Sequence, residues 1–138
     1  KYLLSTVSGL LGQTLYALGR FDEVEPLGRL ARDLATSDDV GTQALWRCVE
    51  AKCLARAGAF DEGEALVGEA LEILADTDHV LFKYGAHVDL AEVRRLAGRN
   101  PAAALEDARR LALEKGSPVM ADAMTALLAE PVGESIVP

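Results

Sequence analysis

The sequence predicts an all-α fold assembled from tandem helix pairs. A phrase of related residues occurs three times, as YALGRFDE at 16–23, ARAGAFDE at 55–62 and RLAGRNPA at 95–102. Its glycines, Gly19, Gly58 and Gly98, fall 39 and 40 residues apart, which is the spacing of a stacked helical array. No segment alternates apolar and polar residues between hairpin turns, as paired strands would.

Composition and charge restrict the class of protein. Hydrophobic residues make up 50% of the chain and charged residues 26%, the balance of a folded domain rather than of a disordered chain. Charged residues interrupt every apolar run before it reaches about 20 residues, so no membrane-spanning helix is expected. The net charge of -8 repels phosphate backbones and anionic lipid. Neither nucleic acid nor a membrane is therefore an expected partner.

The cysteines and the first residues indicate a cytoplasmic protein. Cys48 and Cys53 lie five residues apart on one expected helix and face about 140° apart, so they cannot easily bridge. Two unpaired thiols fit a reducing cytosol. No secretory pattern opens the sequence, and Lys1 leads directly into helical periodicity. We therefore expect a piece cut from a longer protein, or a processed chain.

Each repeated phrase predicts the end of one helix, a tight turn and the start of the next. The glycine allows the left-handed backbone that ends a helix without a side-chain clash. An aromatic residue follows in the first two copies, where it can fill the wedge between antiparallel helices. Asp22 with Glu25, and Asp61 with Glu64, then resemble capping boxes that satisfy free backbone N–H groups.

Other helix ends are predicted from polar caps and prolines. Asn100 is a good N-cap, and Pro101 suits a first helical position, where the missing N–H has no consequence. Ser117 and Pro118 repeat that pairing and open a last helix, which Pro131 ends. The third copy of the phrase therefore keeps its role with different residues.

Apolar residues recur at helical spacing between these turns. Pro26 lies near the start of the second helix, where it removes a backbone donor. The helices are expected at 2–18, 22–36, 41–57, 61–75, 79–97, 101–115 and 118–129. They group into one repeat domain over 1–130 with units 2–36, 41–75 and 79–115 and a capping helix at 118–129, followed by a flexible tail at 131–138.

The order of these features is similar to the tetratricopeptide repeat. The matching residues are Leu11, Gly12, Gly19, Phe21 and Ala31 in the first unit, Ala51, Gly58, Phe60 and Ala70 in the second, and Leu90, Ala91, Gly98 and Ala108 in the third. The sequence departs from the family in three ways. Its units exceed the usual length of about 34 residues, Glu50 holds a position that is normally apolar, and the third unit lacks the aromatic residue.

Longer units of this kind resemble the repeat regions that follow ATPase modules in large bacterial signalling proteins, including nucleotide cyclases and transcription regulators. The stretch from Trp46 to Gly98 carries most of this likeness. The resemblance implies a right-handed superhelix of helix pairs that binds a protein, a peptide or a regulatory ligand along its concave wall. It implies no catalysis.

In tetratricopeptide-like stacking the first helix of each pair lines this groove, so equivalent positions before the repeat glycines would face a partner. Six residues before the glycines lie Gln13, Lys52 and Glu92, and three before them lie Tyr16, Ala55 and Arg95. Arg56 lies beside these positions. The predicted partner-binding lining is Gln13, Tyr16, Lys52, Arg56, Glu92 and Arg95. The competing interpretation is that these are solvated groove residues without a partner.

No residue pattern predicts an enzyme, a metal site or a cofactor. His79 and His87 lie eight residues apart and match no zinc spacing. Asp89 and Glu92 can share a helix face, which ion pairing with the arginines at 94 and 95 explains. Both cysteines lie in mid-helix and favour core packing. The glycines stand singly at helix ends, unlike a phosphate-binding loop.

We therefore predict a non-catalytic interaction or regulatory module with a protein or peptide partner. The alternative is a structural spacer or a self-association element. The helix at 2–18 has apolar residues on more than one side, as expected if an earlier repeat or a second copy covers it in a homodimer; these are Leu3, Leu4, Val7, Leu10 and Leu11. A small enzyme would need a convergent acid, base and nucleophile, and no such set can be assembled.

Overall fold

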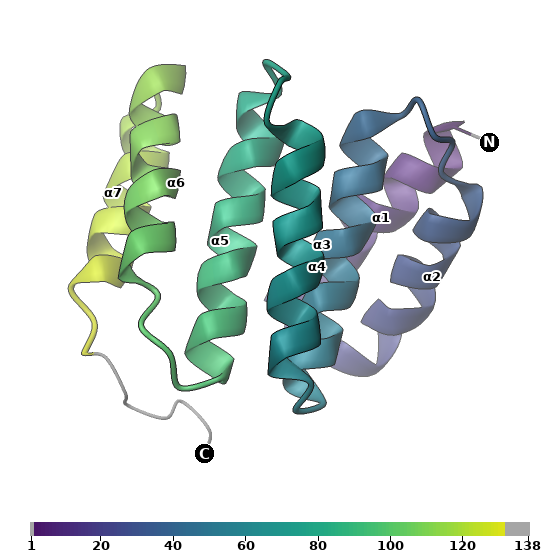
Figure 1. Ribbon diagram of the computed structural model, residues 1–138, viewed down its shortest axis with the longest axis horizontal. Coiled ribbons are helices and arrows are strands. Elements are labelled where there is room, and N and C mark those ends of the chain that lie inside the picture. Colours follow the sequence, from purple (N-terminus) through teal and green to yellow (C-terminus); the bar gives the residue numbers. More distant parts are fainter. Residues whose placement is uncertain (1, 132–138) are drawn as a thin grey trace.

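The computed structural model describes residues 2–131, and this part of the chain forms helices and no strands (Figure 1). The helices are α1 (Tyr2–Ala17), α2 (Val24–Leu34), α3 (Val40–Arg56), α4 (Phe60–Leu74), α5 (Val80–Leu96), α6 (Ala102–Lys115) and α7 (Pro118–Leu128), with a short 3-10 helix, η1 (Phe21–Glu23), before α2. The all-α class is thus confirmed, and every predicted helix end lies within two residues of its observed position. Apart from Pro131, the tail predicted at 131–138 lies outside the described residues.

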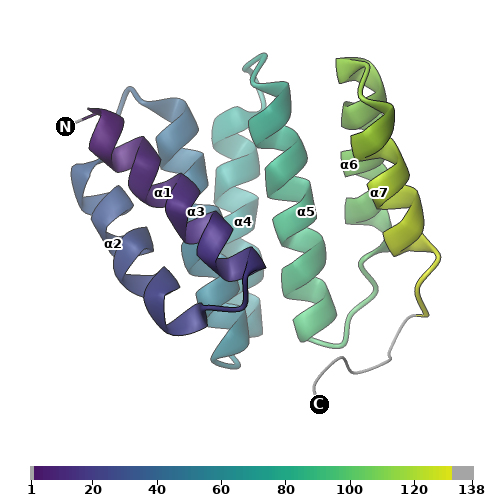
Figure 2. The same ribbon diagram turned by 180° about the vertical axis from the view of Figure 1, so that it is seen from behind.

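The helices pair in chain order. α1 packs against α2, α3 against α4, and α5 against α6, while α7 packs on α6. Successive pairs meet where α2 contacts α3 and where α4 contacts α5. α3 also contacts both α1 and α5, so the first helices of the pairs share one face of the row (Figure 2). The right-handed superhelical path that the resemblance implies stays a prediction.

The three repeat glycines end α1, α3 and α5 as predicted. Gly19, Gly58 and Gly98 have φ angles of 75°, 90° and 70°. In each turn the residue after the glycine donates its backbone N–H to the carbonyl five residues earlier, at 2.8 to 2.9 Å. This closure satisfies carbonyls that the end of a helix leaves free. Gly116, with a φ of 75°, ends α6 with the same kind of bond, and the repeated phrase did not reveal this fourth turn.

The polar cap predicted for the last helix is confirmed. The Ser117 hydroxyl accepts the backbone N–H of Met120 at 3.3 Å, with Pro118 as the first residue of α7. Asn100 Oδ1 accepts the backbone N–H of Ala102 at 2.9 Å. Helix α6 begins at Ala102, one residue later than predicted, and its N-cap residue is Pro101, without a side-chain cap. The N-cap role predicted for Asn100 and the first helical position predicted for Pro101 are therefore wrong.

The capping boxes predicted at Asp22 and Asp61 are wrong. Neither η1 nor α4 has a side-chain cap, and both begin one residue earlier, at the aromatic residue that follows the glycine turn. Each aspartate therefore already lies inside the first helical turn, where its charge still favours the helix N-terminus. The Asp61 carboxylate instead accepts a hydrogen bond from the Arg99 guanidinium at 2.6 Å.

The core lies between neighbouring helices and uses small residues where they cross. Its largest cluster consists of Ala51, Ala55, Val67, Leu90, Ala91, Val93, Ala104, Leu105, Ala108 and Met124. Gly63 shows how closely α3 and α4 approach, since a Cβ atom there would lie 2.8 Å from the backbone oxygen of Ala51. A Cβ atom at Gly9 on α1 would lie 2.6 Å from Leu45 on α3. Close stacking of successive pairs therefore depends on residues that lack bulk.

Candidate functional site

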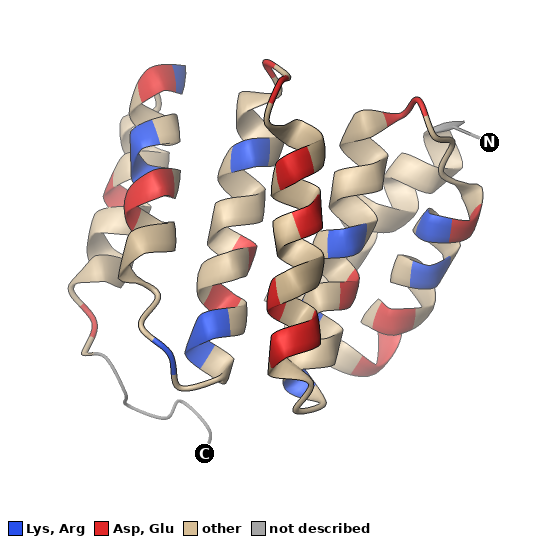
Figure 3. Cartoon of the chain, viewed as in Figure 1, with Lys and Arg blue, Asp and Glu red and all other residues tan. Residues whose placement is uncertain are grey.

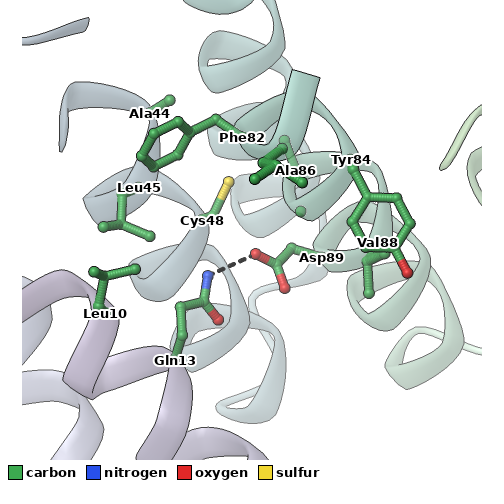
Figure 4. Close-up of a pocket in the computed structure, with 12 residues that line it drawn as sticks. Leu10, Gln13, Ala44, Leu45, Cys48, Phe82, Tyr84, Ala86, Val88 and Asp89 are labelled. Carbon is green, nitrogen blue, oxygen red and sulfur yellow. Dashed lines mark hydrogen bonds between the residues drawn. The ribbon is translucent and has the colours of Figure 1, made fainter. Parts of the chain in front are cut away.

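A pocket of about 400 Å³ opens on the face that α1, α3 and α5 share. Most of its lining is apolar and includes Leu10, Ala44, Leu45, Phe82, Ala86 and Val88. Gln13 and Asp89 provide its polar edge, and Cys48 points into it from α3 (Figure 4). A concave apolar site with a few polar groups is the usual form of a binding pocket.

Gln13, Lys52 and Asp89 form a hydrogen-bonded network that ties the three helices together beside this pocket. The Lys52 ammonium lies 3.0 Å from Asp89 Oδ1. The Gln13 amide donates to Asp89 Oδ2 at 2.8 Å, as Figure 4 shows. Lys52 also donates to the side-chain oxygen of Gln13. Lys52 is 4% exposed and Asp89 is 6% exposed. Two charges this deeply buried are tolerated because each pairs with the other and is hydrogen-bonded.

The Asp89 carboxylate keeps room for another donor. An ionised carboxylate offers about four lone-pair positions; Lys52 and Gln13 occupy one on each oxygen, and the Cys48 thiol also hydrogen-bonds to Asp89. Asp89 also lines the pocket, whereas Lys52 lies outside its lining. A ligand that fills the apolar space can therefore place an N–H or O–H group against Asp89 at the edge.

The cysteine in the pocket has the chemistry of an apolar wall. Burial raises the pKa of the Cys48 thiol well above its usual range, and the nearby Asp89 carboxylate raises it further. Burial also raises the pKa of Cys53, and both cysteines are free. Each group is a thiol rather than a thiolate at neutral pH, and the thiol is a poor nucleophile.

A second cluster on this face surrounds Tyr16. Its ring meets the Phe21 ring edge-on at a centroid distance of 5.1 Å, and the Lys52 ammonium lies 4.2 Å from the Tyr16 ring centroid. The Arg56 guanidinium lies 3.3 Å from the Phe21 ring centroid. Burial and the negative charge of Glu92 raise the pKa of Tyr16 to about 12, although the Arg56 charge opposes this shift. The phenol is thus neutral at physiological pH.

Four of the six residues predicted to line the groove are linked to one another, directly or through Phe21: Gln13, Tyr16, Lys52 and Arg56. The other two, Glu92 and Arg95, form an ion pair on α5. Lys52 is buried and already paired with Asp89, so its charge is not available to a partner. It holds α3 to α5 beneath the exposed residues of this face. The remaining five side chains are more exposed than Lys52.

The ion pairing predicted for Asp89 and Glu92 is half correct. Glu92 pairs with Arg95, as expected. Arg94 instead lies 3.5 Å from Glu64 on α4, and Asp89 belongs to the buried network. The reason is helical geometry, because Asp89 lies about one turn before Glu92 and reaches α3 rather than the arginines.

The two histidines lie in different surroundings. His79 is the N-cap residue of α5, and its ring centroid lies 5.8 Å from that of Phe82. His87 Nδ1 lies 3.8 Å from Asp107 Oδ2, and burial lowers the pKa of His87 more than this carboxylate raises it. Within residues 2–131 no three His, Cys, Asp or Glu side chains are grouped to hold a metal ion.

Our sequence reasoning missed the apolar walls of the pocket, although a signal for them exists. Leu45 and Cys48 lie 13 and 10 residues before their repeat glycine, and Gly85 and Val88 lie 13 and 10 before theirs. These positions continue the predicted groove face toward the helix start by one and two turns. Extending the comparison of equivalent positions would have found them.

No protein-family model, curated protein or solved structure matches this chain. The likeness to the tetratricopeptide repeat therefore rests on the repeated glycine turns and on the pairing of the helices. None of the helices in the described range is long and apolar enough to cross a membrane.

Proposed function

We propose that the chain is a non-catalytic interaction module that binds a segment of another protein on the face of α1, α3 and α5. The observation that carries this proposal is the open apolar pocket of about 400 Å³ with Gln13 and Asp89 at its edge. A large apolar side chain of the partner occupies the pocket. The partner backbone then crosses the face toward the Tyr16 cluster.

The chemistry of the site suggests what the partner carries. Full burial of one Leu, Phe or Met side chain contributes about 1.5–3 kcal/mol, enough for an anchor. A donor beside that anchor adds a charge-assisted hydrogen bond to a remaining lone pair of Asp89, and a partner without a donor lacks this bond, which gives specificity. The net charge of -8 favours Lys or Arg near the anchor. The expected partner is a basic segment with one large apolar residue.

The setting of this module follows from the resemblance and the cysteines. The likeness to repeat regions of large bacterial signalling proteins supports a regulatory role, in which the bound segment controls or recruits a neighbouring activity. Two free thiols support a cytoplasmic location. The proposal assigns the chain no chemistry of its own.

The experiment selects binders from a displayed library of short random peptides and measures their affinity for a filled-pocket variant. Gly85 lines the pocket, and a Cβ atom there meets nothing within 4 Å, so Gly85→Leu places a side chain in the open space. Gly68 on α4 is the matched control, since it is also helical and open but does not line the pocket.

We expect the selected peptides to be basic and to contain a large apolar residue. Gly85→Leu should bind them at least about tenfold more weakly than the wild type does, and Gly68→Leu should bind them equally well. Circular dichroism checks that both variants stay helical. Selected peptides that bind Gly85→Leu as tightly as the wild type would place their site elsewhere and refute the proposal. A library that yields no binder would refute it as well.

A further inference from the structure

Helix α1 buries the side that carries its serines, Gly9, Gly12 and Leu15, and exposes most of its other large apolar residues. Ser5 is 0% exposed and Ser8 is 3% exposed, and their hydroxyls donate to backbone carbonyls of Ala31 and Leu4 at 3.0 and 2.7 Å. The exposed large residues are Leu3 (77%), Leu4 (53%), Val7 (47%), Leu10 (49%), Leu11 (44%) and Leu18 (65%), which we call the α1 stripe. Because the buried serine hydroxyls are hydrogen-bonded, this side of α1 can face the core, and the α1 stripe faces outward.

The α1 stripe has the spacing of a helix-packing seam. Leu4, Val7, Leu11, Thr14 and Leu18 are separated by three, four, three and four residues, as in two heptads. Leu18 continues the helical path, because its N–H donates to the Thr14 carbonyl at 3.0 Å. Together with Leu3 and Leu10, these residues cover about 120° of the helix circumference. A seam of this width packs against another helix.

The stripe is also complementary to itself. Leu4, Leu11 and Leu18 are spaced one heptad apart, so the large residues keep the same order in either direction. When two copies of α1 cross antiparallel about a two-fold axis at Leu11, Leu4 of each copy meets Leu18 of the other. Contacts of this reciprocal kind are what a two-fold interface requires.

Charge and position favour a second copy of the chain. The segment from Tyr2 to Leu18 contains no Asp, Glu, Lys or Arg, although the chain carries a net charge of -8, so two stripes meet without repulsion (Figure 3). Helix α1 belongs to the helix pair at one end of the described row and lies in front of α2 and α3 in Figure 2. The exposed residues of the stripe can bury on the order of 1,000 Å² in total between two copies, which is the size of a weak, reversible interface.

We propose that the chain forms a two-fold homodimer in which the α1 stripes of two copies pack antiparallel across Leu11. The modest area makes this a reversible dimer with a dissociation constant in the micromolar range. The surface differs from the peptide-binding face, and only Leu10 borders both. Dimerisation and peptide binding can therefore fail independently.

Sedimentation equilibrium tests the proposal on the whole chain. We expect the average mass to rise from 14.7 kDa toward twice that value as the concentration increases from about 1 µM to about 300 µM. Leu4→Gln with Leu11→Gln raises the dissociation constant at least about tenfold. The matched control is Leu113→Gln with Val119→Gln, two exposed residues on α6 and α7, and it changes nothing.

Cysteine substitution tests the antiparallel register. Under mild oxidation Leu11→Cys links to its own copy, because this position lies on the two-fold axis. Leu4→Cys and Leu18→Cys link only when the two variants are mixed, and the wild-type chain reports any background from Cys53. A chain that stays monomeric at every concentration, a dimer unaffected by the Leu4 and Leu11 substitutions, or separate linking of Leu4→Cys and of Leu18→Cys would each overturn the proposal.

Discussion

The buried pair of Lys52 and Asp89 gives the sharpest test of how this fold is held together. Asp89→Asn keeps the shape of the side chain and removes its charge. The Lys52 ammonium, 3.0 Å away and 4% exposed, then has no counter-ion. Breaking a buried pair in this way costs about 3–5 kcal/mol of unfolding free energy. That is a large part of the ~5–15 kcal/mol that stabilises a typical domain.

A double-mutant cycle separates the loss of the pair from the loss of one charge. Lys52→Met and Asp89→Leu each leave one buried charge, whereas the double variant leaves none. We expect the double variant to lose about 2–3 kcal/mol less than the sum of the single losses. The control is Glu69→Gln, which removes an exposed ion pair. The Glu69 carboxylate lies 3.2 Å from Arg47, and its side chain is 58% exposed. Its loss is about 0–1 kcal/mol.

Urea unfolding measures these differences, since urea does not screen the charges. Far-ultraviolet circular dichroism follows the helices, and fluorescence of Trp46 follows α3, which carries Lys52. The reasoning is refuted if Asp89→Asn loses no more stability than Glu69→Gln. It is also refuted if the losses of Lys52→Met and Asp89→Leu simply add.

Three further predictions concern other parts of the fold. Gly63→Ala places a Cβ atom 2.8 Å from the Ala51 carbonyl oxygen and lowers the unfolding free energy by about 1–3 kcal/mol. Gly68→Ala on the same helix raises the unfolding free energy by up to about 1 kcal/mol. Equal urea midpoints for the two variants would contradict this prediction. Gly58→Ala, at a φ of 90°, loses about 1–2 kcal/mol through backbone strain, and an unchanged midpoint would show that the turn relaxes. Burial lowers the pKa of His87 in the folded chain, so the unfolded chain binds the proton more tightly and stability falls as the pH drops below about 6.5. Urea midpoints across pH will show a shallower fall in His87→Gln; equal slopes in the two chains would contradict a lowered pKa of His87.

The glycine turns explain why the helices could be predicted so closely. A left-handed glycine together with a backbone bond to the carbonyl five residues earlier is a local closure, complete within one short segment. The same closure explains the error at Asp22 and Asp61. It places the aromatic residue at the start of the next helix, so the acid that follows comes too late to cap it.

The candidate site was predicted only in part. Gln13 and Lys52 lie together because they occupy equivalent positions on stacked helices, which the repeat spacing reveals, and Tyr16 and Arg56 lie within one turn of these positions. The pairing of Asp89 with Lys52 depends on how far α5 lies from α3 and how it is rotated. Neither quantity can be obtained from spacing along one helix.

The sequence by itself determined the number of helices, their ends and the order in which they pair, because turns and caps are closed by bonds between residues a few positions apart. Tertiary structure alone decided which side of α1 is buried, where the pocket opens and that Lys52 and Asp89 share a buried site. These features come from packing among residues far apart in the chain. The small residues at helix crossings set the spacing there, and through it which side chains reach one another.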